Sequence, residues 1–406
     1  MIISRAVVWL LLCTPSLASA WTYSPVISVS EMHQAHTFAH LESSGNRSIA
    51  ISGGLVGISW EDNHRGKPEV YVAFKDLDAP QFSAPLRVSD SAPAYESALA
   101  GLGDGRFVVV WEAGDHIWSR VVSPQQSGKV QQLSPQIARE ATVSTGADAQ
   151  LWLAWAAKTK GHFRIVVTRA TLQGNQLQLA GVKPVDPIQP KQDQLYPSIA
   201  VTATGSSVGW EDRRYGHTRL FTAFAPTGKW FGPIRQLNQL KDKRSNTYGN
   251  GTGAMRVVLA SDGAQRVLAS WLDKRDFDEG YDVYAATSRN GGKTFSGNEK
   301  VEDMLGANQP QWHASGVMDR QGHAVVAWDD QRDGSPDIWI SWRKGGGWSD
   351  NENPSGASGK GEQSHPAMIF DTTGRLHMAF LERGDGYVAI RYLVATPAST
   401  EFDASP

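Results

Sequence analysis

Apolar and polar positions alternate along most of the chain after residue 20, a period that predicts β-strands rather than helices. One unit recurs: an alternating strand, a Gly turn, a second strand that ends in an aromatic residue, an acidic turn and a third strand. The second strands end at Trp60, Trp111, Trp155, Trp210, Trp271, Trp328 and, in a seventh copy, Phe380. A spacing of roughly fifty residues fits four short strands with their turns.

The two ends of the chain complement each other. The seventh unit stops after its third strand, residues 388–392, and lacks a fourth. Residues 23–29 resemble fourth strands such as residues 82–88, each with an aromatic residue first and then a Pro that is followed by an apolar residue. A strand that completes the last blade closes a ring and removes its free edges. We therefore expect an all-β fold, a seven-bladed β-propeller closed by an N-terminal strand; the alternative is a six-bladed ring with an irregular insertion.

The first twenty residues have the pattern of a secretory signal peptide. Arg5 precedes a short apolar stretch, and Ala18-Ser19-Ala20 forms a small-x-small cleavage site. We expect residues 1–20 to be a signal peptide, 21–396 a single propeller domain and 397–406 a disordered C-terminal tail. Cleavage would remove the single cysteine, so a periplasmic or secreted bacterial protein is expected.

Composition narrows the range of partners. The 39 Lys and Arg against 41 Asp and Glu give a net charge of -2, which argues against nucleic acid as a partner. One cysteine excludes a disulfide framework and a Cys-based metal cluster. No later stretch has the length of a membrane span. We expect a monomer with an unknown carbohydrate or protein ligand.

The acidic turns carry a recognisable sequence, Trp-acidic-Asp-x-Arg-x-Gly. Residues 210–216 and 328–334 show it best. The unit resembles the BNR-repeat, sialidase-like β-propellers. The family's Asp-box is matched by Ser288, Asn290, Gly292, Thr294 and Phe295, with Asn in place of Asp. The resemblance covers nearly the whole mature chain and implies a fold more strongly than an activity.

Because this motif recurs in blade after blade, we interpret it as structural. Each Asp is expected to cap its own turn and pair with its own Arg, while each Trp packs between blades. Exposed pairs of this kind contribute only about 0–1 kcal/mol. The residues concerned are Asp62, Arg65, Asp212, Arg214, Asp273, Arg275, Asp330 and Arg332.

The starts of the first strands differ from blade to blade. Counting back from each Trp places equivalent positions near Gly45, Glu96, Tyr196, Ala254, His313 and His365, with Arg139 and Glu140 near the third. These positions begin the innermost strands and can reach the axial mouth, on the face of the 2–3 turns. A mixture of acidic, aromatic and basic side chains suits a binding pocket. The candidate ligand-binding residues are Glu96, Tyr196, Arg256, Trp312, His313 and His365; ordinary turn chemistry is the alternative.

A histidine cluster lies between the closing strand and the first blade. If that link is helical, His33, His36 and His40 share one side and could bind zinc or copper, with Glu42 as the nearest carboxylate. Solvated loop histidines are the interpretation we prefer, so we expect no cofactor.

The resemblance to sialidases implies an arginine triad, a Tyr nucleophile with a Glu partner, and an Asp acid. The family's Arg-Ile-Pro motif is absent, and the nearest text is Arg47-Ser48-Ile49. Arg47, Arg139 and Arg256 could form a triad and Tyr248 could serve as nucleophile, but no motif supports them. We therefore favour a non-catalytic propeller that binds its ligand at the axial face. An exo-sialidase-like glycoside hydrolase and a periplasmic metal-binding protein are the alternatives.

Overall fold

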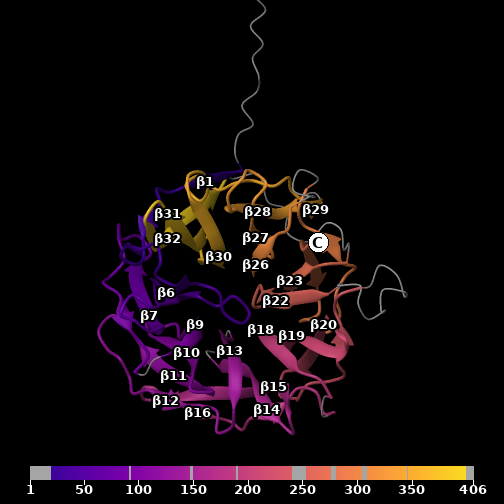
Figure 1. Ribbon diagram of the computed structural model, residues 1–406. Helices are drawn as coiled ribbons and strands as arrows, with labels where there is room; N and C mark the ends of the chain where they lie inside the picture. The colour runs from indigo at the N-terminus through magenta and orange to yellow at the C-terminus, as the bar shows by residue number, and fades with distance from the viewer. Residues whose placement is uncertain are drawn as a thin grey trace, which may run out of the picture.

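The computed structural model is a ring of seven β-sheets around a central axis, and it contains only strands and turns within the residues it describes (Figure 1). Those residues are 20–90, 93–146, 150–188, 191–239, 253–275, 280–303, 309–344 and 346–398. Residues 1–19 of the proposed signal peptide and 399–406 of the proposed C-terminal tail lie outside them. Within the described part of the chain, no helix has the length and apolar character needed to cross a membrane.

Each sheet is one blade, counted from the innermost strand outward. Blade 1 has β4 (Ala39–His40) and β5 (Ile49–Ser52) beside β6 (Leu55–Asp62), then β7 (Glu69–Asp76) and β8 (Leu86–Arg87). Blade 2 has β9 (Tyr95–Gly101), β10 (Phe107–Ala113), β11 (His116–Val122) and β12 (Gln131–Gln132). Blade 3 has β13 (Ala138–Thr145), β14 (Leu151–Thr159) and β15 (His162–Gln173), with β16 (Gln176–Leu179) and β17 (Lys183–Pro184) on its edge.

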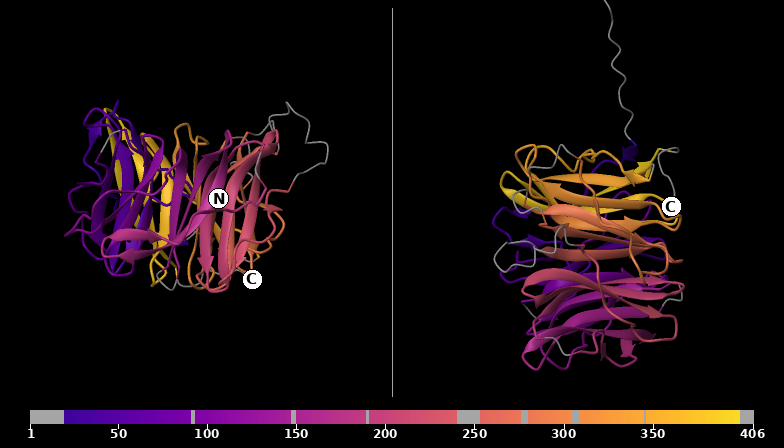
Figure 2. Two further views of the ribbon diagram at one scale, coloured as in Figure 1. Left: turned by 90° about the horizontal axis from the view of Figure 1, so that it is seen from below. Right: turned by 90° about the vertical axis from the view of Figure 1, so that its right-hand side faces the viewer.

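The next three blades follow the same plan. Blade 4 has β18 (Gln194–Thr202), β19 (Gly205–Tyr215), β20 (His217–Pro226) and β21 (Arg235–Gln236). Blade 5 has β22 (Ala254–Ser261), β23 (Val267–Asp273), β24 (Asp282–Ser288) and β25 (Glu299–Lys300). Blade 6 has β26 (Trp312–Met318), β27 (Ala324–Asp330), β28 (Asp337–Lys344) and β29 (Gly347–Trp348). The innermost strands contact one another around the axis, and the strands run along the ring's depth (Figure 2).

Blade 7 joins the two ends of the chain. It has β30 (Glu362–Phe370), β31 (Leu376–Gly384) and β32 (Tyr387–Pro397), and β32 pairs with β1 (Trp21–Tyr23), β2 (Ile27–Ser28) and β3 (His33–Gln34). Ile27 lies opposite Tyr392 in this antiparallel ladder. The predicted seven-bladed ring and its closure by the N-terminal segment are confirmed.

The hydrophobic core is divided among the seams between neighbouring blades. Seven clusters of buried residues each combine side chains of two adjacent blades. The aromatic residue that ends each second strand packs against the preceding blade, and Trp210, Trp271 and Trp328 are fully buried. The predicted position of Trp between blades is therefore confirmed.

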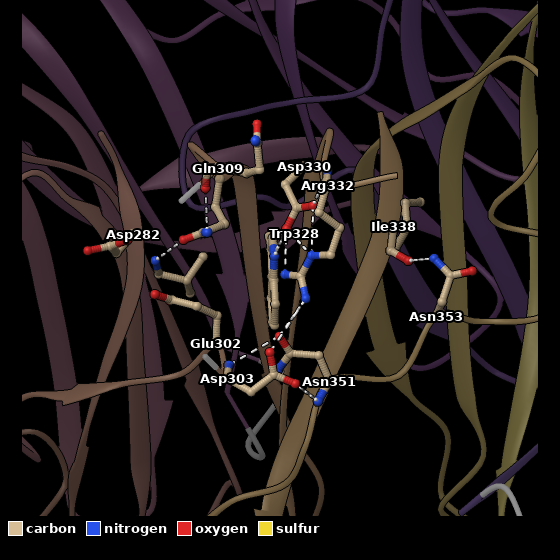
Figure 3. A network of polar contacts seen from close by, with 12 residues as sticks. Asp282, Glu302, Asp303, Gln309, Trp328, Asp330, Arg332, Ile338, Asn351 and Asn353 are labelled. Atoms are coloured by element: carbon tan, nitrogen blue, oxygen red, sulfur yellow. Dashed lines mark hydrogen bonds and ion pairs between the residues drawn. The ribbon is translucent and has the colours of Figure 1, made fainter. Parts of the chain in front are cut away.

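The Trp also anchors the acidic turn that follows it. In blade 6, Trp328 Nε1 donates to Asp330 Oδ2 at 3.0 Å, and Arg332 Nη2 meets the same oxygen at 2.6 Å (Figure 3). Arg332 also reaches Asp303 at 3.6 Å, at the end of the preceding blade. We call each such trio a seam motif; its members are Trp210, Asp212 and Arg214 in blade 4, Trp271, Asp273 and Arg275 in blade 5, and Trp328, Asp330 and Arg332 in blade 6.

Blade 1 departs from the expected pairing. Asp62 accepts from Trp60 Nε1 at 2.9 Å, but its second partner is the His64 imidazole. Arg65 instead lies 3.9 Å from Glu69, with 58% of its side chain exposed. The predicted pair of Asp62 and Arg65 is wrong, because His64 stands two residues after the Asp, where the other motifs have Arg.

Candidate functional site

The innermost strands share an unusual backbone feature near their start. One non-glycine residue per blade has a left-handed conformation, with φ between 49° and 57°. We call these residues the axial ring: Asn46, Glu96, Glu140, Tyr196, Arg256, His313 and His365. Side chains with a Cβ rarely adopt this conformation, and it costs roughly 1–2 kcal/mol per residue. Only Asn46 is a residue type that tolerates it well.

β-Bulges explain this conformation in six blades. In blades 2 to 7 the pairing between the innermost strand and its neighbour shifts register at the ring residue. A bulge places an extra residue in one strand and redirects its side chain. In blade 1 the ring residue lies between β4 and β5, where the innermost strand is interrupted.

Carboxylates from the preceding blade hold these bulges. Glu112 accepts the backbone N–H of Glu140 at 3.1 Å, and Glu140 accepts that of Tyr196 at 2.8 Å. Glu211 bonds the N–H of Arg256 at 2.8 Å. Asp329 does the same for His365 at 3.0 Å, and Glu61 accepts from the backbone of Glu96. Each left-handed residue in these five blades therefore carries a bond to its neighbouring blade.

The sequence located most of this ring. Glu96, Tyr196, His313 and His365 lie at the equivalent positions that were expected, and Arg256 belongs with them. In two blades the position obtained by counting back from the Trp precedes the ring residue. It is Ala254 where the ring residue is Arg256, and Gly45 where the ring residue is Asn46. In blade 3 the member is Glu140.

Trp312 lies beside this ring rather than in it. Its side chain is 40% exposed, and its ring contacts Tyr281 with centroids 5.5 Å apart. Among the described residues, no hydrogen bond, ion pair or ring contact joins the Trp312 side chain to another candidate residue.

Residues 41–48, which we call the crossing segment, run from blade 1 into the centre of the ring (Figure 1). Arg47 Nη2 donates to the carbonyls of Ile199 at 2.7 Å and Leu259 at 2.8 Å, in blades 4 and 5. Ser44 Oγ donates to the carbonyl of Pro197, and Asn46 Nδ2 to that of Pro366. Because it bonds to blades on several sides of the axis, this segment brings Glu42 into the middle of the ring residues.

Three imidazoles meet on one side of the mouth. His40 comes from blade 1, His313 from blade 6 and His365 from blade 7. The rings of His313 and His365 stack with centroids 3.5 Å apart, and His40 meets His365 edge-on at 5.5 Å. Burial and the neighbouring His313 lower the pKa of His365 well below its ordinary value, so this imidazole is neutral at pH 7. Burial opposes the charged form of His40, but its bond to Glu61 and the charges of Glu61, Glu96 and Glu42 together outweigh burial and raise the pKa.

An arginine and a tyrosine occupy another side. The Arg256 guanidinium lies over the Tyr196 ring, 3.7 Å from its centroid, and Arg256 Nε is 3.5 Å from Glu42 Oε1. Glu42 therefore lies between this pair and His40, whose Nε2 is 3.9 Å from Glu42 Oε2. The cation and the ring face together offer a place for an anionic or planar group.

The remaining side is lined by buried acids. Burial raises the pKa of Glu96 to about 8, and those of Glu140 and Glu211 to about 7. Buried carboxyls lose the hydration that stabilises their charged form, so these groups are partly protonated at neutral pH. Perturbed acids of this kind gather at functional sites more often than elsewhere.

The histidines proposed from the sequence do not form one group. The link that holds them is extended, in strands β3 and β4, so the helical spacing that would align them is wrong. His33 stacks on His64 with centroids 4.3 Å apart, His36 is exposed, and His40 faces the axis. Among the described residues, His33 groups with Asp62 and His64, whereas His40 groups with Glu42 and His365.

The three arginines considered for a sialidase-like triad make different contacts and do not form one group. Arg47 is engaged by backbone carbonyls, and Arg139 lies over the Phe163 ring at 4.2 Å. Only Arg256 lies among the ring residues with its guanidinium toward other candidate side chains. Tyr248 falls outside the described residues.

Comparison with known proteins finds similarity in fold but none in sequence family. No family model matches the sequence, and no curated protein matches it. Among solved structures, polysaccharide lyase Uly1 aligns with a TM-score of 0.57 at 10% identity, covering 86% of this chain and 89% of that one. A PL25 ulvan lyase aligns with a TM-score of 0.56 at 9% identity, covering 89% and 94%. The likeness is one of fold. The propeller is thus shared with carbohydrate-active proteins.

Sequence reasoning missed the acids that follow the Trp. These acids are Glu61, Glu112, Glu211 and Asp329, each directly after the Trp of its second strand. The alternation of side chains along a strand could have identified them. The Trp and the residue two positions later point to the same face of the sheet, toward the preceding blade. The residue between them therefore points toward the next blade. That is where the left-handed backbone lies.

Proposed function

We propose that this protein is a secreted propeller that captures a ligand, most simply a carbohydrate, at the axial mouth without turning it over. The observation that supports this is the axial ring, which gathers seven side chains of five types at one mouth. A purely structural position would repeat one residue type, as the seam motif does. Backbone strain held at the same place in every blade is also typical of functional sites.

The chemistry of the mouth suits a polar ligand. Tyr196 offers a ring face, Arg256 a cation, and Glu96 and the histidines offer donors and acceptors. The fold likeness to two polysaccharide lyases makes a saccharide the first ligand to test; a protein ligand is the alternative. The resemblance of the repeats to BNR and Asp-box propellers is consistent with this proposal, as is the turn at Ser288, whose Oγ accepts the N–H of Gly292 at 2.9 Å.

Glycan-array binding tests the placement. The double variant Tyr196→Asn with His313→Asn should lose capture of whatever glycan the parent binds, because Asn fits the left-handed backbone while removing both rings. A matched control, Tyr215→Asn with His162→Asn, changes exposed residues at the 2–3 turns of the same face. Equal loss in both variants, or undiminished binding by the first, would contradict the axial placement. Absence of glycan binding by the parent would contradict the carbohydrate ligand.

Glycoside hydrolysis is the second candidate, and Glu96 favours it. Its buried Oε2 has no hydrogen-bond partner among the described residues, and burial raises its pKa to about 8, as a proton donor requires. We nevertheless expect no turnover, since the sialidase arginines are not assembled. Release of fluorophore from a fluorogenic sialoside by the parent, lost in Arg256→Asn, would overturn the non-catalytic proposal.

Export is part of the same proposal. Strand β1 begins at Trp21, the residue that cleavage after Ala20 would leave as the N-terminus. Mass spectrometry of the periplasmic or secreted protein should find Trp21 first. An intact Met1, or retention in the cytosol, would contradict export.

A further inference from the structure

Two imidazoles of the mouth and the carboxylate of the crossing segment converge on one point. His40, Glu42 and His365 each offer one ligand atom, and these atoms all lie within 4.8 Å of one another. His313 stacks on His365 and forms a second such group with His365 and Asp329. His40 and Glu42 are two residues apart, whereas His313 and His365 belong to the last two blades, so ring closure brings the two pairs together.

Each imidazole is held by its Nδ1. His40 Nδ1 bonds to Glu61 at 2.8 Å, and His313 Nδ1 to Asp329 at 2.8 Å. His365 Nδ1 bonds to the Oγ of the neighbouring Ser364 at 2.9 Å. These bonds fix the ring orientation and leave Nε2 of each imidazole for another partner. Metal-binding histidines almost always have their other ring nitrogen held in this way.

The Nε2 atoms of His40, His313 and His365 have few partners among the described residues. Apart from the 3.9 Å approach of Glu42 to His40, the described residues give the three Nε2 atoms no hydrogen bond. The buried Oε2 atoms of Glu61 and Glu96 also have no partner there. Buried polar groups are normally satisfied, so the mouth has polar atoms oriented toward something it does not itself supply.

We propose that the mouth binds a divalent first-row transition-metal cation of the zinc class through His40 Nε2, Glu42 and His365 Nε2. Imidazole and carboxylate are the ligands that such ions take, and three protein ligands leave room for a further one. His313, stacked on His365, is the fourth candidate. This site differs from the one considered at His33, His36 and His40, with which it shares only His40, and it does not depend on the proposed capture of a carbohydrate.

The other histidine group fits a metal less well. Asp62 already accepts from Trp60 Nε1 and from the His64 ring and N–H, so its oxygens serve the first blade's acidic turn. His33 Nε2 lies 4.0 Å from Asp62 Oδ2. We assign this group to the turn and use it as the control.

Metal titration of the mature full-length propeller tests the site. Protein dialysed against chelator is titrated with zinc by calorimetry, and the bound metal is counted by elemental analysis. We expect one equivalent in the parent and an affinity at least a hundredfold lower in His365→Asn. Asn suits the left-handed backbone at that position, so the fold should survive, and circular dichroism checks this. Cobalt(II) should report nitrogen and oxygen ligands in its visible spectrum.

Three further variants keep the result decisive. His64→Asn should leave zinc affinity unchanged, and Glu42→Gln should lower it even if His365→Asn does not fold. Glu61→Gln, which removes only the carboxylate behind His40, should weaken zinc about 10–100-fold. The proposal is overturned if the parent takes up no zinc, if His365→Asn and Glu42→Gln bind like the parent, or if uptake is lost only in His64→Asn. An unchanged affinity in Glu61→Gln would remove the assigned role of that carboxylate.

Discussion

The axial ring recurs once per blade and the seam motif in blades 4, 5 and 6, and the two differ in what varies. The seam motif keeps its residue types, and in blades 4, 5 and 6 its Asp is paired with both Trp and Arg. The axial ring keeps its backbone conformation and changes its side chain in nearly every blade. A repeated fold thus has two kinds of equivalent position, one where chemistry is fixed by packing and one where geometry is fixed and chemistry is free.

Their carboxylates should respond in opposite ways to the same chemical change. Asp330 is fully buried beside Arg332, so Asp330→Asn leaves this buried cation with only the more distant carboxylate of Asp303, 3.6 Å away, and should lower the free energy of unfolding by about 3 kcal/mol. Glu140→Gln should instead raise the free energy of unfolding at pH 7, because burial raises the pKa of Glu140 to about 7 and so penalises its charged form, whereas the neutral Gln can still accept the Tyr196 N–H. Urea unfolding of both variants measures this difference. Equal losses would show that the two acids have the same role.

The pH dependence of stability should separate the two regions next. Burial raises the pKa values of Glu140 and Glu211 to about 7, above the 4.5 of an unperturbed glutamate. Between pH 4.5 and 7 the folded protein therefore binds more protons than the unfolded one. The contribution of these groups is fully present below pH 4.5 and is lost as pH rises to about 7, with a slope of up to about 1.4 kcal/mol per pH unit for each group.

Urea unfolding from pH 5 to 8 in the presence of chelator, with the parent and the Glu140→Gln, Glu211→Gln double variant, measures this slope. The double variant should lose most of the decline in this range. A decline of the same size in both proteins would mean that other groups cause it.

The difference between the seam motif and the axial ring also explains which parts of the structure can be predicted from the sequence. The Trp-ended strands and the unpaired terminal strand predict the ring because burial and edge closure act on residue types that are visible in the sequence. The axial ring gives no such local signal, since Glu96, Tyr196 and Arg256 are not residues that favour a left-handed backbone. Its positions were found only by counting, which failed by one or two residues at Gly45 and Ala254. The histidine site was missed because the crossing segment, not local spacing, brings Glu42 to His365.

Strain in the ring should be released by a residue that tolerates it. Glu96 has φ 52°, and its buried Oε2 has no partner among the described residues. Glu96→Asn should raise the free energy of unfolding by about 1 kcal/mol, since Asn adopts the left-handed backbone conformation at a lower energetic cost than Glu. Glu96→Gln removes the charge but keeps the strain, so the difference between the two variants in urea unfolding reports the strain itself. If Gln stabilises as much as Asn, the backbone is not strained at this position.

The smallest effect is expected where the seam motif is incomplete. Arg65 lies 3.9 Å from Glu69 with 58% of its side chain exposed, while His64 has the place beside Asp62. Such a pair is screened by solvent, so Arg65→Ala should change the free energy of unfolding by about 0–1 kcal/mol. Arg332→Ala removes the partner of a buried Asp and should cost several times more, because the Arg332 side chain is only 7% exposed. Urea unfolding at two salt concentrations compares them: only the small Arg65 effect should fade with salt. A loss at Arg65 as large as at Arg332 would mean that the motif stabilises the blade through the presence of an arginine in the turn, and not through its burial against the Trp and Asp.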